Sequence, residues 1–218
     1  QFLETGYAKR PLLIVPNQTY KQWISEFKKF AGHIRINEFY NLDANYIEDW
    51  KDVNGVTKMV AEKIFIDANS TVGDKNIKFS VVRYGNVTGS RGSVVPLFIQ
   101  QSKQGVLTIT DEQMTRFWIT LDQGVDLVLS SLGKMSGGEI FIPKIPSIKV
   151  IDLAKTIAPK AKIKIVGIRP GEKIHEFLIS TDEARHTKDF GSHYVIFPEF
   201  DFGGRFKSQR TGKNLVEG

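Results

Sequence analysis

From about residue 55 onward, helix-like and strand-like segments alternate along the chain, and this alternation constrains the fold more than any other feature. The helical candidates carry apolar residues at three- and four-residue intervals, whereas the strand candidates are short apolar runs. Such spacing is typical of crossover units in an α/β protein. We expect helices at 55–69, 93–103, 123–132 and 149–157, and strands at 78–84, 106–110, 116–120, 139–142 and 161–166.

The composition narrows the class of protein further. The 218 residues are 41% apolar, enough for one good core, and no apolar run approaches the length of a bilayer span. The absence of cysteine excludes disulfides and thiolate metal sites, and the four histidines lack metal-ligand spacing, so we expect no metal. With no basic region ahead of an apolar stretch at the start, we expect a cytoplasmic protein without a membrane partner.

The net charge of +6 comes entirely from residues 51–218. Residues 1–50 carry six Lys/Arg and six Asp/Glu, and the remainder carries twenty-four against eighteen. The excess is spread as single residues and as the alternating run 160–164, which a half-solvated strand would show. A diffuse positive balance suits an anionic ligand such as a nucleotide diphosphate at least as well as a polynucleotide. Charge alone does not decide between them.

The first fifty residues form a strand–helix unit of their own. A buried-strand candidate at 12–15 is followed by Pro16 and Asn17, and apolar residues then recur on one face of a helix that ends at Gly32. The string KRPLLIVPNQTYKQWISEFKKF resembles the strand and helix that follow the nucleotide loop of Swi/Snf-type helicases. No Walker A loop or acidic helicase box accompanies it, so a plain strand–helix packing unit is the main alternative.

Three motifs carry a second resemblance, which covers residues 51–206. They are Asn54-Gly-Val-Thr-Lys58, Val81-Val-Arg-Tyr-Gly-Asn-Val87 and Arg169-Pro-Gly-Glu-Lys173. Their order and spacing resemble the extended short-chain dehydrogenase/reductase family, and most closely its inverting UDP-N-acetylglucosamine 4,6-dehydratases of polysaccharide biosynthesis. The resemblance implies the C-terminal part of a Rossmann-like α/β domain with a small α/β substrate domain.

We therefore expect three segments along the chain. They are a helicase-like fragment at 1–50, the C-terminal part of a nucleotide-sugar dehydratase at 51–204, and a polar tail at 205–218 that frays. The whole resembles a junction of two coding sequences, natural or artefactual. No Gly-x-Gly-x-x-Gly or Gly-x-x-Gly-x-x-Gly loop, which a dinucleotide cofactor would need, occurs anywhere in the chain.

The resemblance also implies a helix that carries a tyrosine and a lysine one turn apart. Lys58 matches the lysine that bonds the nicotinamide ribose, but Asn54 occupies the tyrosine position. In the family the phenolate takes a proton from a sugar hydroxyl, whereas a carboxamide has no titratable proton and cannot act as that base. The family's acid–base group shortly upstream is missing too. Residues 181–183, Thr-Asp-Glu, are interpreted instead as the start of a helix.

A Gly-rich loop at residues 85–92, which is distinct from the missing dinucleotide loop, supplies further implied site residues. Tyr84, Gly85 and Asn86 would border the nicotinamide ring and the substrate, and Arg91 would approach the substrate phosphates. Glycines in this loop would let the backbone come close to a ligand. A tight turn with an exposed arginine is the plainer alternative for Arg91.

Two arginines complete the implied substrate site. Arg116, in the string ITDEQMTRFWIT, would hold a phosphate through two parallel charge-assisted hydrogen bonds. In the motif that begins at Arg169, a rigid Pro-Gly turn would aim Arg169 at the diphosphate and place Glu172 at the nucleoside ribose.

The implied function is that of an NAD(P)-dependent enzyme acting on a UDP-N-acetylhexosamine. The family oxidises C4, eliminates water across C5–C6 and returns the hydride to C6. We expect little or no such turnover from this chain, and we expect its binding of NAD(P) to fail. Two alternatives stay open: a non-catalytic UDP-sugar-binding protein that uses Arg91, Arg116 and Arg169, and, ranked last, a nucleic-acid-associated module suggested by residues 1–50. A homo-oligomer is also left open.

Overall fold

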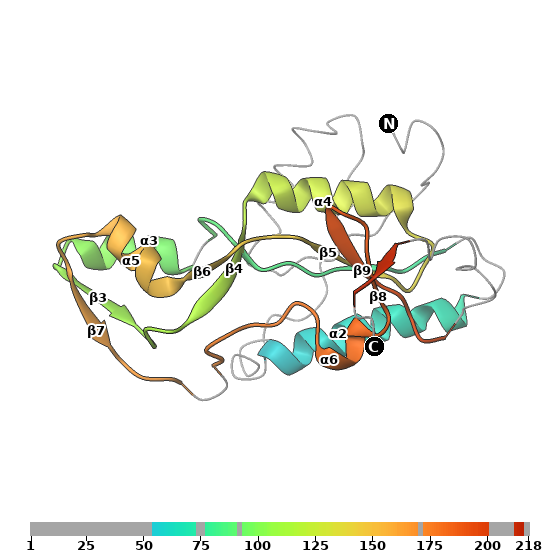
Figure 1. Cartoon of the computed structure of the whole chain (residues 1–218), viewed down its shortest axis with the longest axis horizontal. Helices are drawn as coiled ribbons and strands as arrows, with labels where there is room; N and C mark the ends of the chain where they lie inside the picture. Colours follow the sequence, from blue (N-terminus) through green and yellow to red (C-terminus); the bar gives the residue numbers. More distant parts are fainter. Residues whose placement is uncertain (1–53, 73–76, 91–92, 170–171, 201–211, 216–218) are drawn as a thin grey trace, which may run out of the picture.

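The computed structural model of the chain describes residues 54–72, 77–90, 93–169, 172–200 and 212–215. In Figure 1 their helices and strands form two groups along the long axis of the molecule, joined through β4 and β6. The elements are α2 (Asn54–Thr71), β1 (Val81–Val82), β2 (Asn86–Val87), α3 (Val94–Ser102), β3 (Val106–Ile109), β4 (Thr115–Ile119), α4 (Leu121–Lys134), β5 (Ile140–Pro143), β6 (Ser147–Lys149), α5 (Val150–Ile157), β7 (Lys162–Ile165), α6 (Thr181–Ala184), β8 (Thr187–Asp189), β9 (His193–Ile196) and β10 (Lys213–Asn214).

The larger group is built on a five-stranded sheet with the strand order β1-β5-β9-β8-β10. β1 and β5 run parallel, and the other neighbouring pairs in this sheet are antiparallel. Helix α4 covers one face of the sheet, and α2 with the short α6 lies on the other (Figure 1). This part of the molecule is therefore a three-layer α/β arrangement.

Side-chain alternation along β5 explains why both faces of the sheet need a helix. Phe141 points to one face, where it packs with Leu127 of α4. Ile140 and Ile142 point to the opposite face and pack with Ile66 of α2. Successive residues of a strand face opposite sides, so a strand that is apolar at every position must be covered twice.

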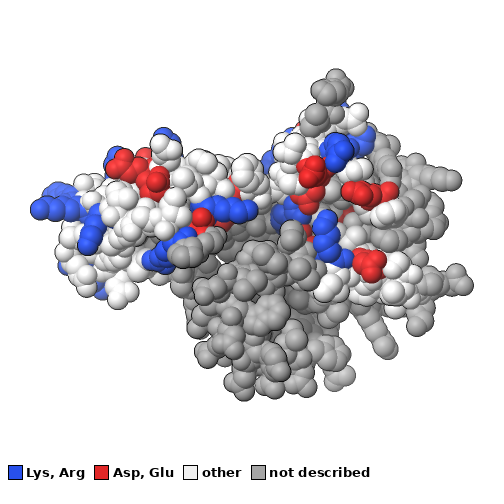
Figure 2. All heavy atoms as spheres, turned by 90° about the horizontal axis from the view of Figure 1, so that it is seen from below, with Lys and Arg blue, Asp and Glu red and all other residues white. Residues whose placement is uncertain are grey.

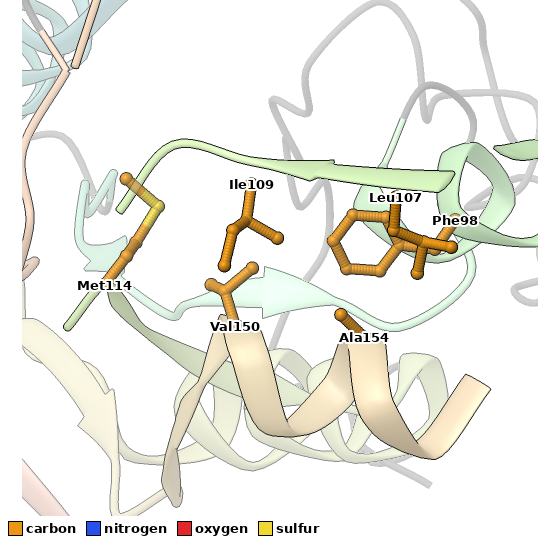
Figure 3. Close-up of a cluster of buried hydrophobic side chains, with 6 residues drawn as sticks. All are labelled: Phe98, Leu107, Ile109, Met114, Val150 and Ala154. Atoms are coloured by element: carbon orange, nitrogen blue, oxygen red, sulfur yellow. The ribbon is translucent and has the colours of Figure 1, made fainter. Parts of the chain in front are cut away.

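The smaller group packs α3 and α5 against the parallel pair β3–β7. Burial of each large side chain between these elements contributes on the order of 2 kcal/mol of stability. This core fixes β3, and therefore the residue Thr110 that follows it. Six buried side chains form the core (Figure 3): Phe98, Leu107, Ile109, Met114, Val150 and Ala154.

Strand β4 links the two groups. It pairs in parallel with β2, where Trp118 lies opposite Asn86, and antiparallel with β6, where Arg116 lies opposite Ile148. Helix α5 begins directly after β6, and the N–H of Val150 donates to the carbonyl just before β4, that of Met114, at 2.9 Å. The start of β4 is thus tied to the smaller core, while its end leads into α4.

The predicted α/β class is confirmed, and each helix and strand expected between residues 55 and 166 is present. Their ends differ by a few residues, except that the strand expected at 78–84 is shortened to β1. The strands β2, β6, β8 and β9 were not predicted. No helix in the described ranges is long and apolar enough to cross a bilayer.

The polar tail differs from its prediction at one point. Lys213 and Asn214, which were expected to fray, form β10 and pair antiparallel with β8. Pairing uses backbone N–H and C=O groups, so a polar stretch can still close the open edge of a sheet. The predicted strand–helix unit at 1–50 and both predicted segment boundaries lie outside the described residues.

Candidate functional site

A segment from late in the chain lies against the start of β4. The N–H of Thr115 donates to the Ile174 carbonyl at 3.0 Å, and Arg116 Nη1 donates to the same carbonyl at 3.1 Å. The Thr115 hydroxyl lies 2.8 Å from His175 Nδ1. The strand that carries Arg116 and the segment that follows Arg169 are therefore joined by hydrogen bonds, and their predicted role as two clamps on one ligand stays a prediction.

Two of the three guanidinium nitrogens of Arg116, Nη1 and Nε, have partners in the structure. Its side chain is 12% exposed, Nη1 also donates to the Thr115 carbonyl at 2.7 Å, and Nε lies 3.4 Å from a carboxylate oxygen of Glu176. No described residue accepts a hydrogen bond from Nη2. Because the guanidinium is planar, fixing Nη1 and Nε also fixes the direction of the two Nη2 donors. The arrangement can present them to an anion.

Glu172 closes the turn that begins at Arg169. Its N–H donates to the Arg169 carbonyl at 3.0 Å, and the N–H of Arg169 donates back to Glu172 Oε2 at 3.3 Å. The Thr110 hydroxyl donates to Glu172 Oε1 at 3.1 Å, which ties the turn to the end of β3. Arg169 itself is exposed, and no described residue bonds its guanidinium. The expected ribose-binding role of Glu172 stays a prediction, and the structure adds a turn-holding role.

Gly85 lies where β4 passes closest to the β1–β2 connection. A Cβ at this position would lie 2.3 Å from the Phe117 carbonyl oxygen and 2.6 Å from the Phe117 Cβ. The close approach that requires glycine here is therefore to the neighbouring strand. Tyr84 packs toward α4, beside Val125 and Val128. The expected position of both residues at a nicotinamide ring stays a prediction.

The remaining expected site residues are only partly described. Asn86 is exposed at the start of β2. Asn54 and Lys58 belong to the first turns of α2, but their side chains are outside the description, and Arg91 lies outside the described residues altogether. The structure thus brings the segments that carry Arg116 and Arg169 together, and the predicted ligand contacts of all these residues stay predictions.

Two buried polar atoms near the Gly-rich loop were missed by the sequence analysis. Ser93 Oγ, at the start of α3, and Trp118 Nε1, on β4 opposite Asn86, have no hydrogen-bond partner among the described residues. An unpaired buried donor costs about 1–3 kcal/mol, so each atom has the environment of a group that binds a water or a ligand. For Trp118, its place two residues after Arg116 on the same predicted strand was the available sequence indication.

A second missed feature is an ion-pair cluster around Arg83. Nε and Nη2 donate to Glu62 of α2 at 3.1 and 2.6 Å, and Nη1 and Nη2 each donate to Glu183 of α6 at 2.9 Å. Nη1 also donates to the Leu178 carbonyl at 2.7 Å. The side chains of Arg83, Glu62 and Glu183 are 17–20% exposed. The sequence indication was a single charge within the otherwise apolar run Val81-Val82-Arg83-Tyr84.

The pKa values of Glu183 and Arg83 are shifted in the directions that favour their charged forms. Burial alone would raise the pKa of Glu183, but hydrogen bonds from Arg83 and Ser180 and the charge of Arg83 lower that pKa to about 2. Burial likewise opposes the charge of Arg83, and its bonds to Glu183 and Glu62 still raise its pKa. Ser180 and Glu183 form a capping box, so the predicted helix start at 181–183 is confirmed.

The charged surface shows no single-signed face in the view of Figure 2. Lys and Arg side chains lie interspersed with Asp and Glu over the described part of that face. Among the described residues, no group of three His, Cys, Asp or Glu is placed to hold a metal ion.

Comparison with known proteins identifies the family to which this chain belongs. A protein family with the description "Polysaccharide biosynthesis protein" matches residues 29–198 of this chain, which is most of its length. This chain belongs to that family. The predicted relation to polysaccharide biosynthesis is thereby confirmed, while the helicase resemblance of residues 1–50 finds no support in these matches.

Individual relatives of this polysaccharide biosynthesis family member include the class of enzyme that its sequence motifs resemble. An inverting UDP-N-acetylglucosamine 4,6-dehydratase of Campylobacter jejuni (serotype O:2) is 53% identical over 150 residues, 68% of this chain and 45% of that protein. A UDP-glucose 4-epimerase of Rickettsia bellii is 45% identical over 148 residues, 65% of this chain and 43% of that protein. The solved structure of Pen from Bacillus thuringiensis has 37% identity and a TM-score of 0.63, covering 66% of this chain and 48% of Pen. The chain thus spans about half the length of the relatives it matches.

The resemblance implies NAD(P), and the expectation that this chain does not bind it stays a prediction, because the side chain of Lys58 lies outside the described residues. Position 54, at the start of α2, is an asparagine, whose carboxamide cannot transfer the required proton. Asn54 therefore gives no basis for the proton transfer that accompanies oxidation of the sugar in the family.

We predict that Gly85→Ala destabilises this polysaccharide biosynthesis protein by about 1–3 kcal/mol, because the new Cβ forces β2 and β4 apart. The matched control is Gly124→Ala, in the interior of α4, where a Cβ meets nothing within 4 Å and alanine is the better helix former. Urea unfolding of both variants measures the difference. Equal stability of the two variants would contradict the close contact with Phe117.

We also predict a pH-dependent contribution from Glu183. Its folded-state pKa of about 2 lies below the ordinary 4.5, so the stabilisation is complete above pH 4.5 and is lost as the pH falls toward 2. After allowance for solvent screening it amounts to on the order of 2 kcal/mol. The melting-temperature gap between the native chain and Glu183→Gln should be wide at pH 6 and close near pH 2.5. Asp182→Asn, at a side chain that is 92% exposed, should show a small gap at both pH values.

Proposed function

We propose that this chain is the sugar-nucleotide-binding part of a 4,6-dehydratase-type protein and that it binds a UDP-N-acetylhexosamine. One observation carries the proposal: Arg116 and the segment that follows Arg169 are fastened to each other at the start of β4, through Thr115 and Ile174. The relatives support the ligand class, because the names of the dehydratase and of the epimerase both specify a UDP-sugar.

The donors suit a diphosphate. The two Nη2 donors of Arg116 have no acceptor among the described residues, and the guanidinium of Arg169 is exposed. The exposed guanidinium of Arg169 can bind a phosphate through two parallel charge-assisted hydrogen bonds, which are roughly twice as strong as neutral ones. Nη2 of Arg116 has two diverging N–H bonds and can donate to two separate phosphate oxygens, so the parallel pair predicted for Arg116 is not available in this geometry. Glu176, 3.4 Å from Arg116 Nε, offsets part of the positive charge and favours a ligand whose uridine and sugar add contacts beyond the phosphates.

We infer that this chain alone does not complete the dehydratase reaction. NAD(P) supplies the family's hydride acceptor and donor, and oxidation at C4 also needs a base for the hydroxyl proton. Asn54 cannot be that base, and residues 41–53 contain no Thr-Asp-Lys/Glu group for the elimination. Binding of the sugar nucleotide needs neither the base at position 54 nor the elimination group. We therefore expect this chain to bind the sugar nucleotide without turning it over.

Calorimetric titration with UDP-N-acetylglucosamine tests the binding proposal. The native chain should bind saturably, and Arg116→Ala or Arg169→Ala should each weaken the affinity by about 10- to 100-fold, as expected for loss of one charge-assisted pair. Arg185→Ala removes an exposed arginine whose one ion pair within the described ranges is with Asp182, and it should leave the affinity unchanged. No heat from a folded native chain would overturn the proposal. Steeply salt-dependent DNA binding that survives both arginine substitutions would favour a nucleic-acid module instead.

We predict that Asn54→Tyr does not restore turnover. A phenol at position 54 would replace the missing base, but the elimination group upstream and the Gly-rich dinucleotide loop would still be absent from the sequence. Incubation with UDP-N-acetylglucosamine and NAD(P), followed by chromatography for a 4-keto product, measures this. A keto-sugar product from the single variant would show that our account of the missing groups is wrong.

A further inference from the structure

Arg83 has every one of its five N–H donors bonded. Two go to Glu62, two go to Glu183, and the fifth goes to the Leu178 carbonyl. A planar guanidinium fixes all five directions at once, so its three partners cannot move independently of one another. Arg83 therefore acts as a rigid junction between three segments.

The junction sits next to the residues implied in sugar binding. Arg83 follows β1 directly and is continuous with Tyr84, Gly85 and Asn86, and its N–H donates to the Phe141 carbonyl of β5 at 2.9 Å. Glu62 belongs to α2, one helical turn after position 58. The same side chain thus sets the end of β1 relative to α2 and to the segment 178–183.

We propose that Arg83 is a positioning residue for the sugar end of the bound nucleotide, which rests on the UDP-sugar binding proposed above. By holding α2 and the 178–183 segment against the end of β1, it fixes where Asn86 meets the ligand. The diphosphate end depends on other contacts, since Arg116 and the Arg169 turn are held by Thr110, Thr115 and Ile174.

The charges of the two glutamates make the Arg83 guanidinium necessary to this junction. Glu62 and Glu183 are mostly buried and carry two negative charges, so removing Arg83 would leave both without their main counter-ion. A lysine keeps the charge, but its ammonium has three donors in place of a planar fork and cannot bond both carboxylates bidentately. Arg83→Lys therefore loosens the junction while keeping its charge.

The test compares two ligands, UDP and UDP-N-acetylglucosamine, by calorimetric titration at a temperature where each variant is fully folded. For Arg83→Lys we expect the affinity for UDP-N-acetylglucosamine to fall at least 5-fold while the affinity for UDP changes less than 2-fold. General structural damage would weaken both ligands alike. Lys144→Gln is the matched control, because it breaks another ion pair between segments, that with Asp189, and should change neither affinity.

If Arg83→Lys does not fold, Glu62→Gln replaces it, since it keeps the shape and removes one charge of the junction. Equal weakening of both ligands, or no change in either, overturns the role of Arg83 and leaves the binding proposal intact. If the native chain binds neither UDP nor UDP-N-acetylglucosamine, the proposed function falls and the role of Arg83 falls with it.

Discussion

The candidate site depends on the pairing of β4 with its neighbours. This one strand pairs with β2 on one side and β6 on the other, and its first residues also bond the Ile174 carbonyl. The segment of β2 and the segment that follows Arg169 are far apart in sequence, and both bond backbone groups of β4. The backbone at Gly85 approaches β4 so closely that even a methyl group on Gly85 would collide with Phe117. Packing of backbone against backbone therefore sets the geometry before any ligand is considered.

The Arg83 cluster shows a different way of joining segments. Burying one cation with two carboxylates costs desolvation energy, and a fully apolar junction could be equally stable. An ionic junction instead fixes direction, because each of the five donors must meet its acceptor. The pKa of Glu183 is lowered to about 2 despite burial, so for this carboxylate the bonds and charge of Arg83 and the bonds from Ser180 outweigh its own burial cost. The ionic junction thus fixes the relative orientation of the segments it joins, which an apolar cluster would not do.

Much of the fold could be predicted because its elements have local periodicity, whereas parts of the site could not. The helices α2 to α5 and the strands β3 and β7 follow from apolar spacing. β2 and β10 have two residues each and are defined by their partners, so no local pattern predicts them. Arg116 was found through its motif. Arg83 was passed over, since Glu62 and Glu183 lie 21 and 100 residues away in sequence.

Glu172 shows how a structural role and a binding role can share one carboxylate. Oε1 accepts from the Thr110 hydroxyl and Oε2 from the Arg169 N–H. A carboxylate has about four lone-pair sites, so each oxygen keeps capacity for a further donor such as a ribose hydroxyl. Holding the turn orients these remaining sites, and the same bonds that place Glu172 also place the backbone of Arg169. The predicted ribose contact is therefore compatible with the observed turn, because the turn fixes the group that would make it.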